Sequence, residues 1–180
     1  MVSYLPILIL FFVTCKIALA QSFELSGKDT INFVDAEGKK QGKWVIKNIT
    51  LHEPCYADDQ VVEEGNFLDS KKVGQWKKYY CNKSIKSVIT YENNRPNGYA
   101  KMYHDNGKIK EEGLWKNSRW VGDYKLYYDN GQVQHEFVFN QTGKRDGGQK
   151  YFYDNGQVAV EGVFANGKEA LDAINKKPYD

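Results

Sequence analysis

Large and polar residues follow a pattern that returns every 24 or 25 residues through most of this chain. In each copy an aromatic residue is followed, a few positions later, by a glycine. The copies are Phe67 with Gly74, Tyr91 with Gly98, Trp115 with Gly122, and Phe139 with Gly147. A fixed period of this length is the signature of a repeat protein.

Each of the later copies contains an Asn-Gly pair at the same repeat position, preceded by Asp and by two large residues. The pairs are Asn106-Gly107, Asn130-Gly131 and Asn155-Gly156, after Tyr103-His104, Tyr127-Tyr128 and Phe152-Tyr153. Asn-Gly between alternating runs favours a two-residue type I′ turn, because both central residues need positive φ. The sequence therefore predicts a β-hairpin in each copy, with Asn-Gly at its tip.

The predicted turn also fixes which residues face each other. If Asp105 pairs with Lys108, then Lys101 lies opposite Glu112 and Gly98 opposite Trp115. The same arithmetic gives Lys125 with Glu136, Gly122 with Phe139, Lys150 with Glu161, and Gly147 with Phe164. Opposite charges stabilise an antiparallel pair, and an aromatic ring covers the backbone that a facing glycine leaves bare.

Two earlier copies depart from the pattern. The hairpin from Gly74 to Tyr91 has Asn82-Lys83 at its tip and Val88 in place of the Glu, and the copy from Gly42 to Phe67 is eight residues longer, with the extra length around residues 52–59. We predict an all-β fold, an elongated single-layer antiparallel meander of about five stacked hairpins over residues 42–167. Residues 21–41 are expected to supply a capping strand, and the tail 168–180 a short closing helix.

Alternation along the strands sorts side chains onto two faces. One face is predicted to carry an aromatic row, whereas the other carries the Lys-Glu pairs with Tyr79, Tyr103, Tyr127 and Phe152. The candidate partner-binding residues of the row are Trp76, Tyr80, Tyr124, Tyr128, Tyr151 and Tyr153. Rows of Tyr and Trp suit protein interfaces or stacking on sugar rings, and the alternative is that they pack only against each other.

The consensus Gly-x-x-x-x-Tyr-Tyr-x-Asn-Gly, with a Glu five residues later and then an aromatic residue, resembles the MORN-repeat variant of bacteria over residues 42–167. The best matches run from Gly98 to Trp115, Gly122 to Phe139 and Gly147 to Phe164. The resemblance implies hairpin scaffolds for protein or membrane contacts, and similar proteins are often classed as antitoxin or immunity components.

The N-terminus has the features of a secretory signal peptide over residues 1–20. An apolar run from Leu5 to Val13 is too short to span a bilayer and precedes Ala18-Leu19-Ala20, a small-x-small site for cleavage before Gln21. A competing interpretation is lipidation of Cys15. We therefore expect an exported protein that is periplasmic, envelope-associated or secreted, with no transmembrane segment in the mature chain.

Cleavage would leave two cysteines, Cys55 and Cys81, both at hairpin tips that neighbouring hairpins could bring together. In an oxidising compartment an even number of cysteines favours a disulfide. The alternative is two free, buried thiols.

The sequence offers no catalytic site, cofactor site or metal site. His52, His104 and His135 lie in different repeats without metal-ligand spacing, and no nucleophile or phosphate-loop motif is present. With 25 basic and 23 acidic residues, the chain also lacks the charge imbalance typical of nucleic-acid binding. The repeated Glu112, Glu136 and Glu161 are already explained by their facing lysines.

The sequence therefore predicts a non-enzymatic interaction scaffold whose partner is another protein, with toxin neutralisation as the narrower hypothesis. The alternative is a structural module of the cell envelope that binds glycan or lipid.

Overall fold

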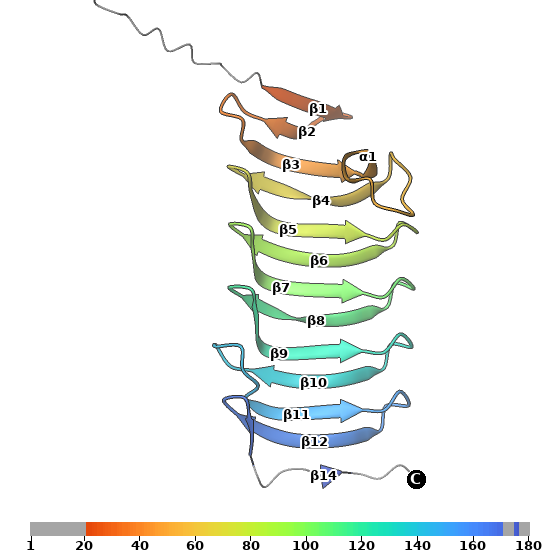
Figure 1. Ribbon diagram of the computed structural model, residues 1–180, viewed down its shortest axis with the longest axis vertical. Helices are drawn as coiled ribbons and strands as arrows, with labels where there is room; N and C mark the ends of the chain where they lie inside the picture. Colours follow the sequence, from red (N-terminus) through yellow and green to blue (C-terminus); the bar gives the residue numbers. More distant parts are fainter. Residues whose placement is uncertain (1–20, 171–174, 177–180) are drawn as a thin grey trace, which may run out of the picture.

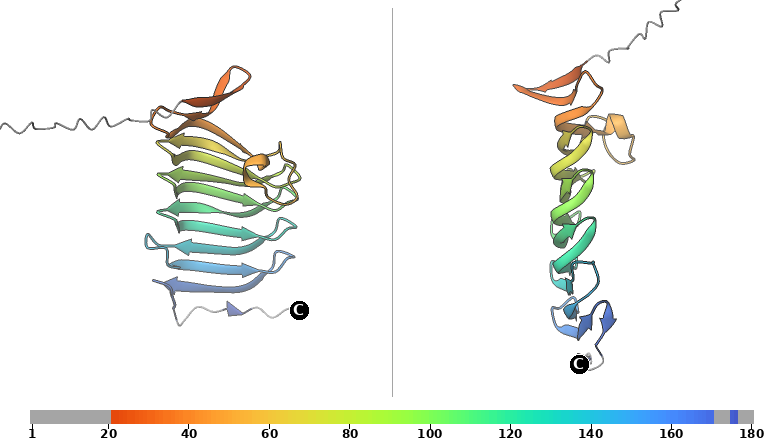
Figure 2. Two further views of the ribbon diagram at one scale, coloured as in Figure 1. Left: turned by 45° about the horizontal axis from the view of Figure 1, so that its top comes forward. Right: turned by 90° about the vertical axis from the view of Figure 1, so that its left-hand side faces the viewer.

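The chain folds into one continuous antiparallel sheet, in which almost every strand pairs with the strand that follows it (Figure 1). This computed structural model describes residues 21–170 and 175–176. The predicted signal peptide, its cleavage site and Cys15 lie outside the described residues. Across the described residues the sheet has 14 strands, and a side view shows a single elongated layer (Figure 2). The predicted all-β meander is confirmed.

Five hairpins form the repeat array, and a shorter hairpin precedes them. The first hairpin joins β1 (Ser22–Ser26) and β2 (Asp29–Val34). The array consists of β3 (Lys40–Lys47) and β4 (Val61–Leu68), β5 (Lys71–Tyr79) and β6 (Ile85–Glu92), β7 (Arg95–Tyr103) and β8 (Ile109–Lys116), β9 (Arg119–Tyr127) and β10 (Val133–Phe139), and β11 (Gly147–Phe152) and β12 (Val158–Ala165). The only helix among the described residues is α1 (Asn48–Leu51), between β3 and β4.

The predicted register is correct. Lys101 faces Glu112 and Gly98 faces Trp115, and the corresponding pairs recur in the later hairpins. The two divergent copies keep the aromatic-glycine pairing, as Gly42 with Phe67 and Gly74 with Tyr91.

The Asn-Gly turns, however, are not type I′. The Gly107 N–H donates to the His104 carbonyl at 3.0 Å, and the His104 N–H donates to the Lys108 carbonyl at 2.8 Å. Gly107 has a φ of +84°, whereas Asn106 is not among the positive-φ residues. This is a three-residue loop, a type I turn closed by a left-handed glycine. The register survives because a bulge beyond Tyr103 inserts one residue and restores the predicted pairing at Met102.

Type I′ turns lie at the opposite edge of the array, between repeats. Both central residues have positive φ at Asn93-Asn94 (50° and 67°) and at Asn117-Ser118 (51° and 64°). The flanking residues pair directly, Glu92 with Arg95 and Lys116 with Arg119. The β10–β11 connection at this edge is an exception, because the Gly143 N–H donates to the Asn140 carbonyl at 2.9 Å and Gly143 has a φ of +79°, as in the three-residue loops.

The ends of the array differ from the predicted caps. Residues 21–41 supply a hairpin rather than one strand, and β2 pairs with β3 at only Phe33–Gln41 and Val34–Lys40. At the other end, β13 (Lys168–Glu169) and β14 (Asn175–Lys176) both pair with β12. These four residues are extended, so the expected closing helix does not include them. Leu171 and Ile174, on which that prediction depends, lie with the rest of residues 171–174 and 177–180 outside the described residues.

One face of the sheet, which we call the front face, holds most of the core. Trp76, Ala100, Tyr124 and Phe137 lie there with at most 9% of their surface exposed. Large rings lean over small residues of the neighbouring strand: a Cβ on Gly65 would overlap the Trp76 ring, and one on Gly113 would lie 3.1 Å from the Trp120 ring. The alternation of large and small residues lets a single layer bury rings without a second sheet.

The glycines opposite the aromatic residues have a different role from the one expected. At Gly42, Gly74 and Gly122, a Cβ would meet nothing within 4 Å, but φ is +67°, +66° and +69°. These positions require glycine for the backbone conformation rather than to make room for a ring.

Candidate interaction surface

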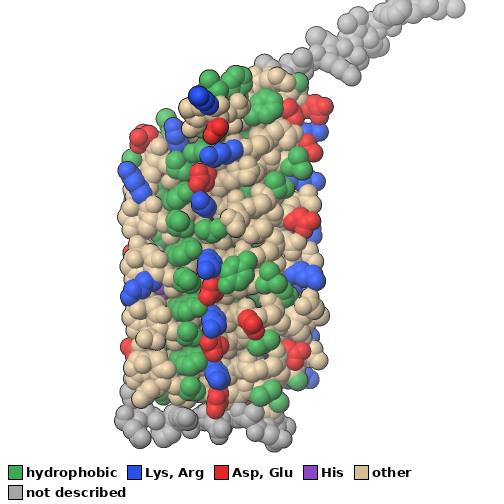
Figure 3. Space-filling view, turned by 180° about the vertical axis from the view of Figure 1, so that it is seen from behind, with side chains coloured by type: hydrophobic (Ala, Val, Ile, Leu, Met, Phe, Trp, Pro, Cys, Tyr) green, Lys and Arg blue, Asp and Glu red, His purple; other side chains and the backbone are tan. Residues whose placement is uncertain are grey.

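A column of alternating charges runs along the back face of the sheet (Figure 3). Lys101, Glu112, Lys125 and Glu136 face one another in turn across consecutive strands, and the row continues through Lys150 and Glu161. We call this row the charged column. The sequence predicted the pairs within hairpins, but the structure also pairs Glu112 and Glu136 with the lysine of the next repeat. Val88 interrupts the column between Lys77 and Lys101.

The ion pairs of the column differ in their exposure to solvent. The Lys125 Nζ lies 2.9 Å from Glu136 Oε1, with 43% and 35% of the side chains exposed. The Lys101 Nζ lies 3.5 Å from Glu112 Oε2. The Glu112 side chain is only 17% exposed, against 38% for Lys101. Exposed pairs such as Lys125–Glu136 contribute little to stability, so the charges of that pair are available to a partner.

A stripe of apolar and aromatic side chains lies beside the charged column, toward the edge with the three-residue turns (Figure 3). Four hairpins contribute one facing pair each, such as Tyr103 with Ile109 and Tyr127 with Val133, and the first hairpin contributes Val61, which faces Lys47. The members are Val61, Tyr79, Ile85, Tyr103, Ile109, Tyr127, Val133, Phe152 and Val158, and none of them is buried. We call this set the back stripe.

Tyrosine hydroxyls connect the back stripe to the charged column. Tyr127 donates to Glu112 at 2.6 Å, and Tyr79 donates to Glu64 at 2.6 Å. A third hydroxyl, that of Tyr99, also donates to Glu112 at 2.8 Å. Partial burial and then the Glu64 carboxylate raise the pKa of Tyr79 to about 12. Partial burial alone would raise the pKa of Glu112, but the Tyr127 and Tyr99 hydroxyls and Lys101 outweigh it and lower that pKa.

Several of the residues predicted to bind a partner are buried or hydrogen-bonded within the sheet. Trp76 is 1% exposed and its indole N–H donates to the Asn66 carbonyl at 3.0 Å. Tyr124 is 9% exposed and donates to Glu111 at 2.7 Å. Tyr151 accepts a hydrogen bond from Arg145 at 2.8 Å. For Trp76 and Tyr124, burial therefore agrees with the alternative in which the rings pack within the sheet, since both belong to its core.

Tyr80 and Tyr128 belong to a hydrogen-bond ladder between repeats rather than to the front face. The Tyr80 hydroxyl donates to the Tyr103 carbonyl at 2.7 Å, and the Tyr128 hydroxyl donates to the Phe152 carbonyl at 2.8 Å. Tyr56 makes the same bond to Tyr79 at 2.8 Å, and His104 Nε2 lies 3.1 Å from the Tyr127 carbonyl. Tyr153 occupies the corresponding repeat position.

The ladder explains the recurring pair of large residues before each turn. The first member lies on the back stripe and the second reaches the next repeat. The sequence signal was the recurring pair itself, because its first member ends the strand and its second member already lies in the turn, where it has a separate environment.

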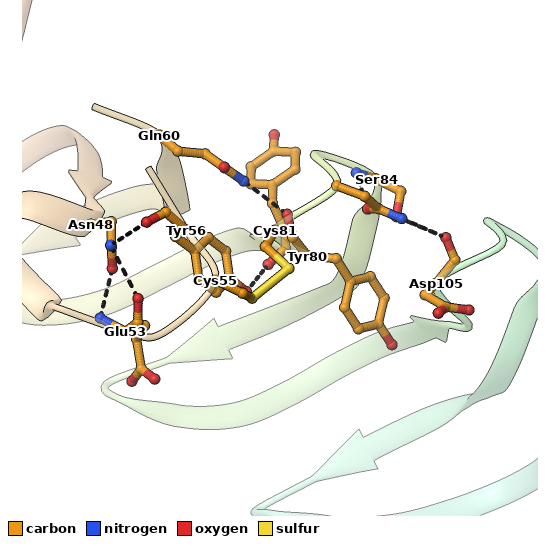
Figure 4. Close-up of a disulfide and its surroundings, with 11 residues drawn as sticks. Asn48, Glu53, Cys55, Tyr56, Gln60, Tyr80, Cys81, Ser84 and Asp105 are labelled. Atoms are coloured by element: carbon orange, nitrogen blue, oxygen red, sulfur yellow. Dashed lines mark hydrogen bonds between the residues drawn. A yellow bond between two sulfur atoms is a disulfide. The ribbon is translucent and has the colours of Figure 1, made fainter. Parts of the chain in front are cut away.

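The long first hairpin carries a braced loop over residues 48–60 (Figure 4). Cys55 and Cys81 form a disulfide with their Cα atoms 5.8 Å apart, as the sequence suggested. The buried Asn48 side chain donates to the carbonyls of Glu53 and Tyr56 and accepts from the Glu53 N–H at 2.7 Å. The Gln60 side chain donates to the Tyr80 carbonyl at 3.0 Å. The loop is therefore tied both to itself and to the neighbouring hairpin.

The three histidines lie in three different hairpins of the array. Burial, and then Arg145, lower the pKa of His135, while His104 belongs to the ladder and His52 ends α1. Within residues 21–170, no three His, Cys, Asp or Glu side chains are grouped so that they could hold a metal ion. The helix in the part of the chain that the structure describes is also too short to cross a membrane.

Comparisons with known proteins point to one repeat family. A family model described as MORN repeat variant matches residues 72–93, 96–117, 120–141 and 145–166, and each segment contains one hairpin of the array. No curated protein sequence matches the chain. Among solved structures, the chain is similar to a mutant of S. aureus TarM in complex with Fondaparinux, alpha-GlcNAc-glycerol and UDP, with 14% identity and a TM-score of 0.35. That similarity covers 53% of this chain and 19% of the other, and it carries no functional argument.

Proposed function

Because the chain belongs to the MORN-repeat proteins of the variant type, we propose that it is an exported, non-catalytic scaffold that binds another protein along its back face. MORN repeats suggest a scaffold for protein or membrane interaction. The observation that carries our choice of face is that the back stripe recurs in every hairpin and stays partly exposed beside open charges. Repeat arrays commonly present such extended surfaces to their partners.

The front face supports the proposal by contrast. Trp76 and Trp120 lie over glycines of the neighbouring strand, Tyr124 donates to a carboxylate, and the front-face rings contact one another, so this face already uses its aromatic side chains in packing. The back stripe combines rings and aliphatic side chains with charges of both signs nearby, which is a typical mixture at protein interfaces.

Export is the second part of the proposal. The apolar run from Leu5 to Val13, followed by Ala18-Leu19-Ala20, supports it, and the Cys55–Cys81 disulfide is compatible with an oxidising compartment. Neutralisation of a toxin is a narrower form of the proposal. It requires a toxin that acts outside the cytosol, in the periplasm or envelope.

The test is an affinity pull-down of the tagged protein, purified in its naturally processed form, from its own cell envelope. The variant Tyr103→Ser/Ile109→Thr removes one pair of the back stripe, and Ile49→Thr/Leu51→Thr removes exposed apolar side chains from the loop as a matched control. Tyr124 and Tyr128 are unsuitable for this test because their loss would disturb the core and the ladder.

We expect a protein that the wild type and the loop control both retain and that the stripe variant loses. Equal recovery by all three would contradict binding through the back stripe. Retention of envelope polysaccharide or lipid without a protein would favour the alternative, a structural module of the envelope.

A further inference from the structure

The braced loop creates a hollow at the N-terminal end of the back stripe. Its volume is about 360 Å³, and it is lined by Ala57, Asp59, Gln60, Val61, Glu64, Tyr79 and Lys83. Val61 and Tyr79 are members of the back stripe, and Glu64 continues the charged column, where it faces Lys77. The hollow is thus continuous with the surface to which we assigned partner binding.

The braced loop is not only longer than the other turns but is also held in place by specific bonds. The other turns of this edge close with five residues, for example His104 to Lys108, whereas 13 residues, 48–60, join β3 to β4. The disulfide, the three bonds of the Asn48 side chain, the Tyr56 hydroxyl and the Gln60 amide all fix it. A site fixed before binding loses less conformational entropy when it is occupied.

The lining indicates the chemistry of the occupant. Ala57, Val61 and the Tyr79 ring offer apolar surface, while Asp59, Glu64 and Lys83 add charge. Glu64 already faces Lys77 and accepts the Tyr79 hydroxyl, so Asp59 supplies the negative charge that is left for an occupant. The Asp59 carboxylate has no hydrogen bond or ion pair to any described residue. An apolar wall with an excess of negative charge complements a side chain that has an apolar stem and a cationic head.

We propose that this hollow is an anchor site for an arginine or lysine side chain of the partner that lies along the back stripe. The inference rests on the proposed function and adds the chemical identity of one partner residue. The alkyl stem contacts Val61 and the Tyr79 ring, and the cationic head pairs with Asp59 beside Glu64. In the other hairpins the short turn leaves the stripe open, so this anchor is specific to the first repeat.

The test uses small mimics whose binding can be located by NMR. The ¹H–¹⁵N spectrum of the full chain is followed during titration with N-acetyl-arginine methylamide, and in parallel with the norleucine and glutamate analogues. We expect saturable shifts confined to amides of residues 57–64 and 79–83 for the arginine compound, with dissociation in the millimolar range, as is typical of one weakly held side chain. Saturable binding of norleucine or glutamate with equal strength, or no saturable shift at these amides, would overturn the proposal.

Two variants test whether the Asp59 carboxylate binds the cationic head of the mimic. Asp59→Asn should weaken the arginine mimic about threefold, in keeping with a partly exposed ion pair. Asp58→Asn is the matched control, because Asp58 is equally exposed in the same loop but does not line the hollow. Unchanged binding in Asp59→Asn, or equal weakening in both, would contradict the assigned role of Asp59.

This experiment is separate from the pull-down. If the stripe variant loses its partner but the arginine mimic causes no shift, the anchor fails and the proposed function stands. If the mimic binds in the hollow while the stripe variant keeps every partner, the hollow is a cation site and the back stripe is not the interface.

Discussion

The two faces of this sheet share the same strands but are built on different principles. On the front face, Trp76 and Ala100 are 1% and 0% exposed, whereas on the back face the side chains of Lys125 and Glu136 are 43% and 35% exposed. A single layer has no second layer to cover it, so one face has to bury its own rings by leaning them across small neighbours. The back face does not have to form the core, and its repeated side chains are available for recognition.

The largest effect is expected from removing a ring of the front face. Trp76→Ala should cost about 3–5 kcal/mol, because it deletes a fully buried side chain and leaves a cavity over Gly65. Ile85→Ala, in the back stripe, should cost clearly less, since Ile85 is 36% exposed. Guanidinium unfolding followed by circular dichroism measures both. Similar losses in the two variants would remove the distinction between the faces.

A methyl group added to each face gives the next largest difference. Gly65→Ala should destabilise the fold by about 1–3 kcal/mol, because its Cβ would overlap the buried Trp76 ring. Gly148→Ala should be neutral or stabilise by up to about 1 kcal/mol, since nothing lies within 4 Å of its Cβ and its φ is not in the left-handed region. Unfolding midpoints compare the pair, and a stabilised Gly65→Ala would show that the ring packing is loose.

The ladder between repeats can be tested by removing one hydroxyl. Tyr128→Phe should cost about 1 kcal/mol, because it leaves the Phe152 carbonyl without the Tyr128 donor while preserving the ring. Tyr103→Phe is the control, since the Tyr103 hydroxyl makes no hydrogen bond to a described residue. Thermal unfolding of the two variants should separate them. An equal effect would mean that the ladder bonds contribute nothing beyond the ring contacts.

The sequence predicted the parts of this fold that depend on period and pairing. Lys101 opposite Glu112 and Gly98 opposite Trp115 follow from counting outward from the turn. These pairs are correct although the turn type is not, because the bulge between Met102 and Tyr103 restores the register. The type I′ turn was assigned to Asn106-Gly107 because that pair gives the stronger signal. The type I′ turns formed by Asn93-Asn94 and Asn117-Ser118 lack the Gly of the Asn-Gly signature.

The distribution of burial between the faces could not be predicted from the sequence. Both faces contain aromatic residues, and which of them is buried depends on Gly65, Gly113 and Ala100 in neighbouring strands rather than on the ring residues themselves. Tyr80 and Tyr128 were assigned to a face because alternation was extended into the turns, where it no longer holds. The hollow beside Asp59 depends on the path of the inserted loop, which no periodic signal encodes.

The pH dependence of stability should link both faces. Burial, and then bonds to Glu111 and Glu112 respectively, raise the pKa values of Tyr124 and Tyr127 above the usual 10. Because the folded-state pKa is the higher one, this contribution is complete below about pH 10 and is lost as the pH rises through the folded-state pKa. Urea midpoints measured from pH 8 to 12 should therefore fall above pH 10. Tyr127→Phe should flatten the fall and Tyr103→Phe should not; identical curves would contradict the assignment.

The smallest change in stability is expected in the charged column, because charges that do not hold the sheet together are free to act in recognition. Lys125→Met should change stability by about 0.5 kcal/mol or less, because an exposed pair such as Lys125–Glu136 gains little over its hydration. That difference should shrink further at 1 M salt, where charges are screened within about 3 Å. Unfolding at low and high salt measures it. A loss of stability comparable to that of Trp76→Ala would mean that the column holds the sheet together. A negligible loss of stability, together with a changed set of proteins in the pull-down, would mean that these charges act in recognition. The contrast between the two faces implies the second outcome.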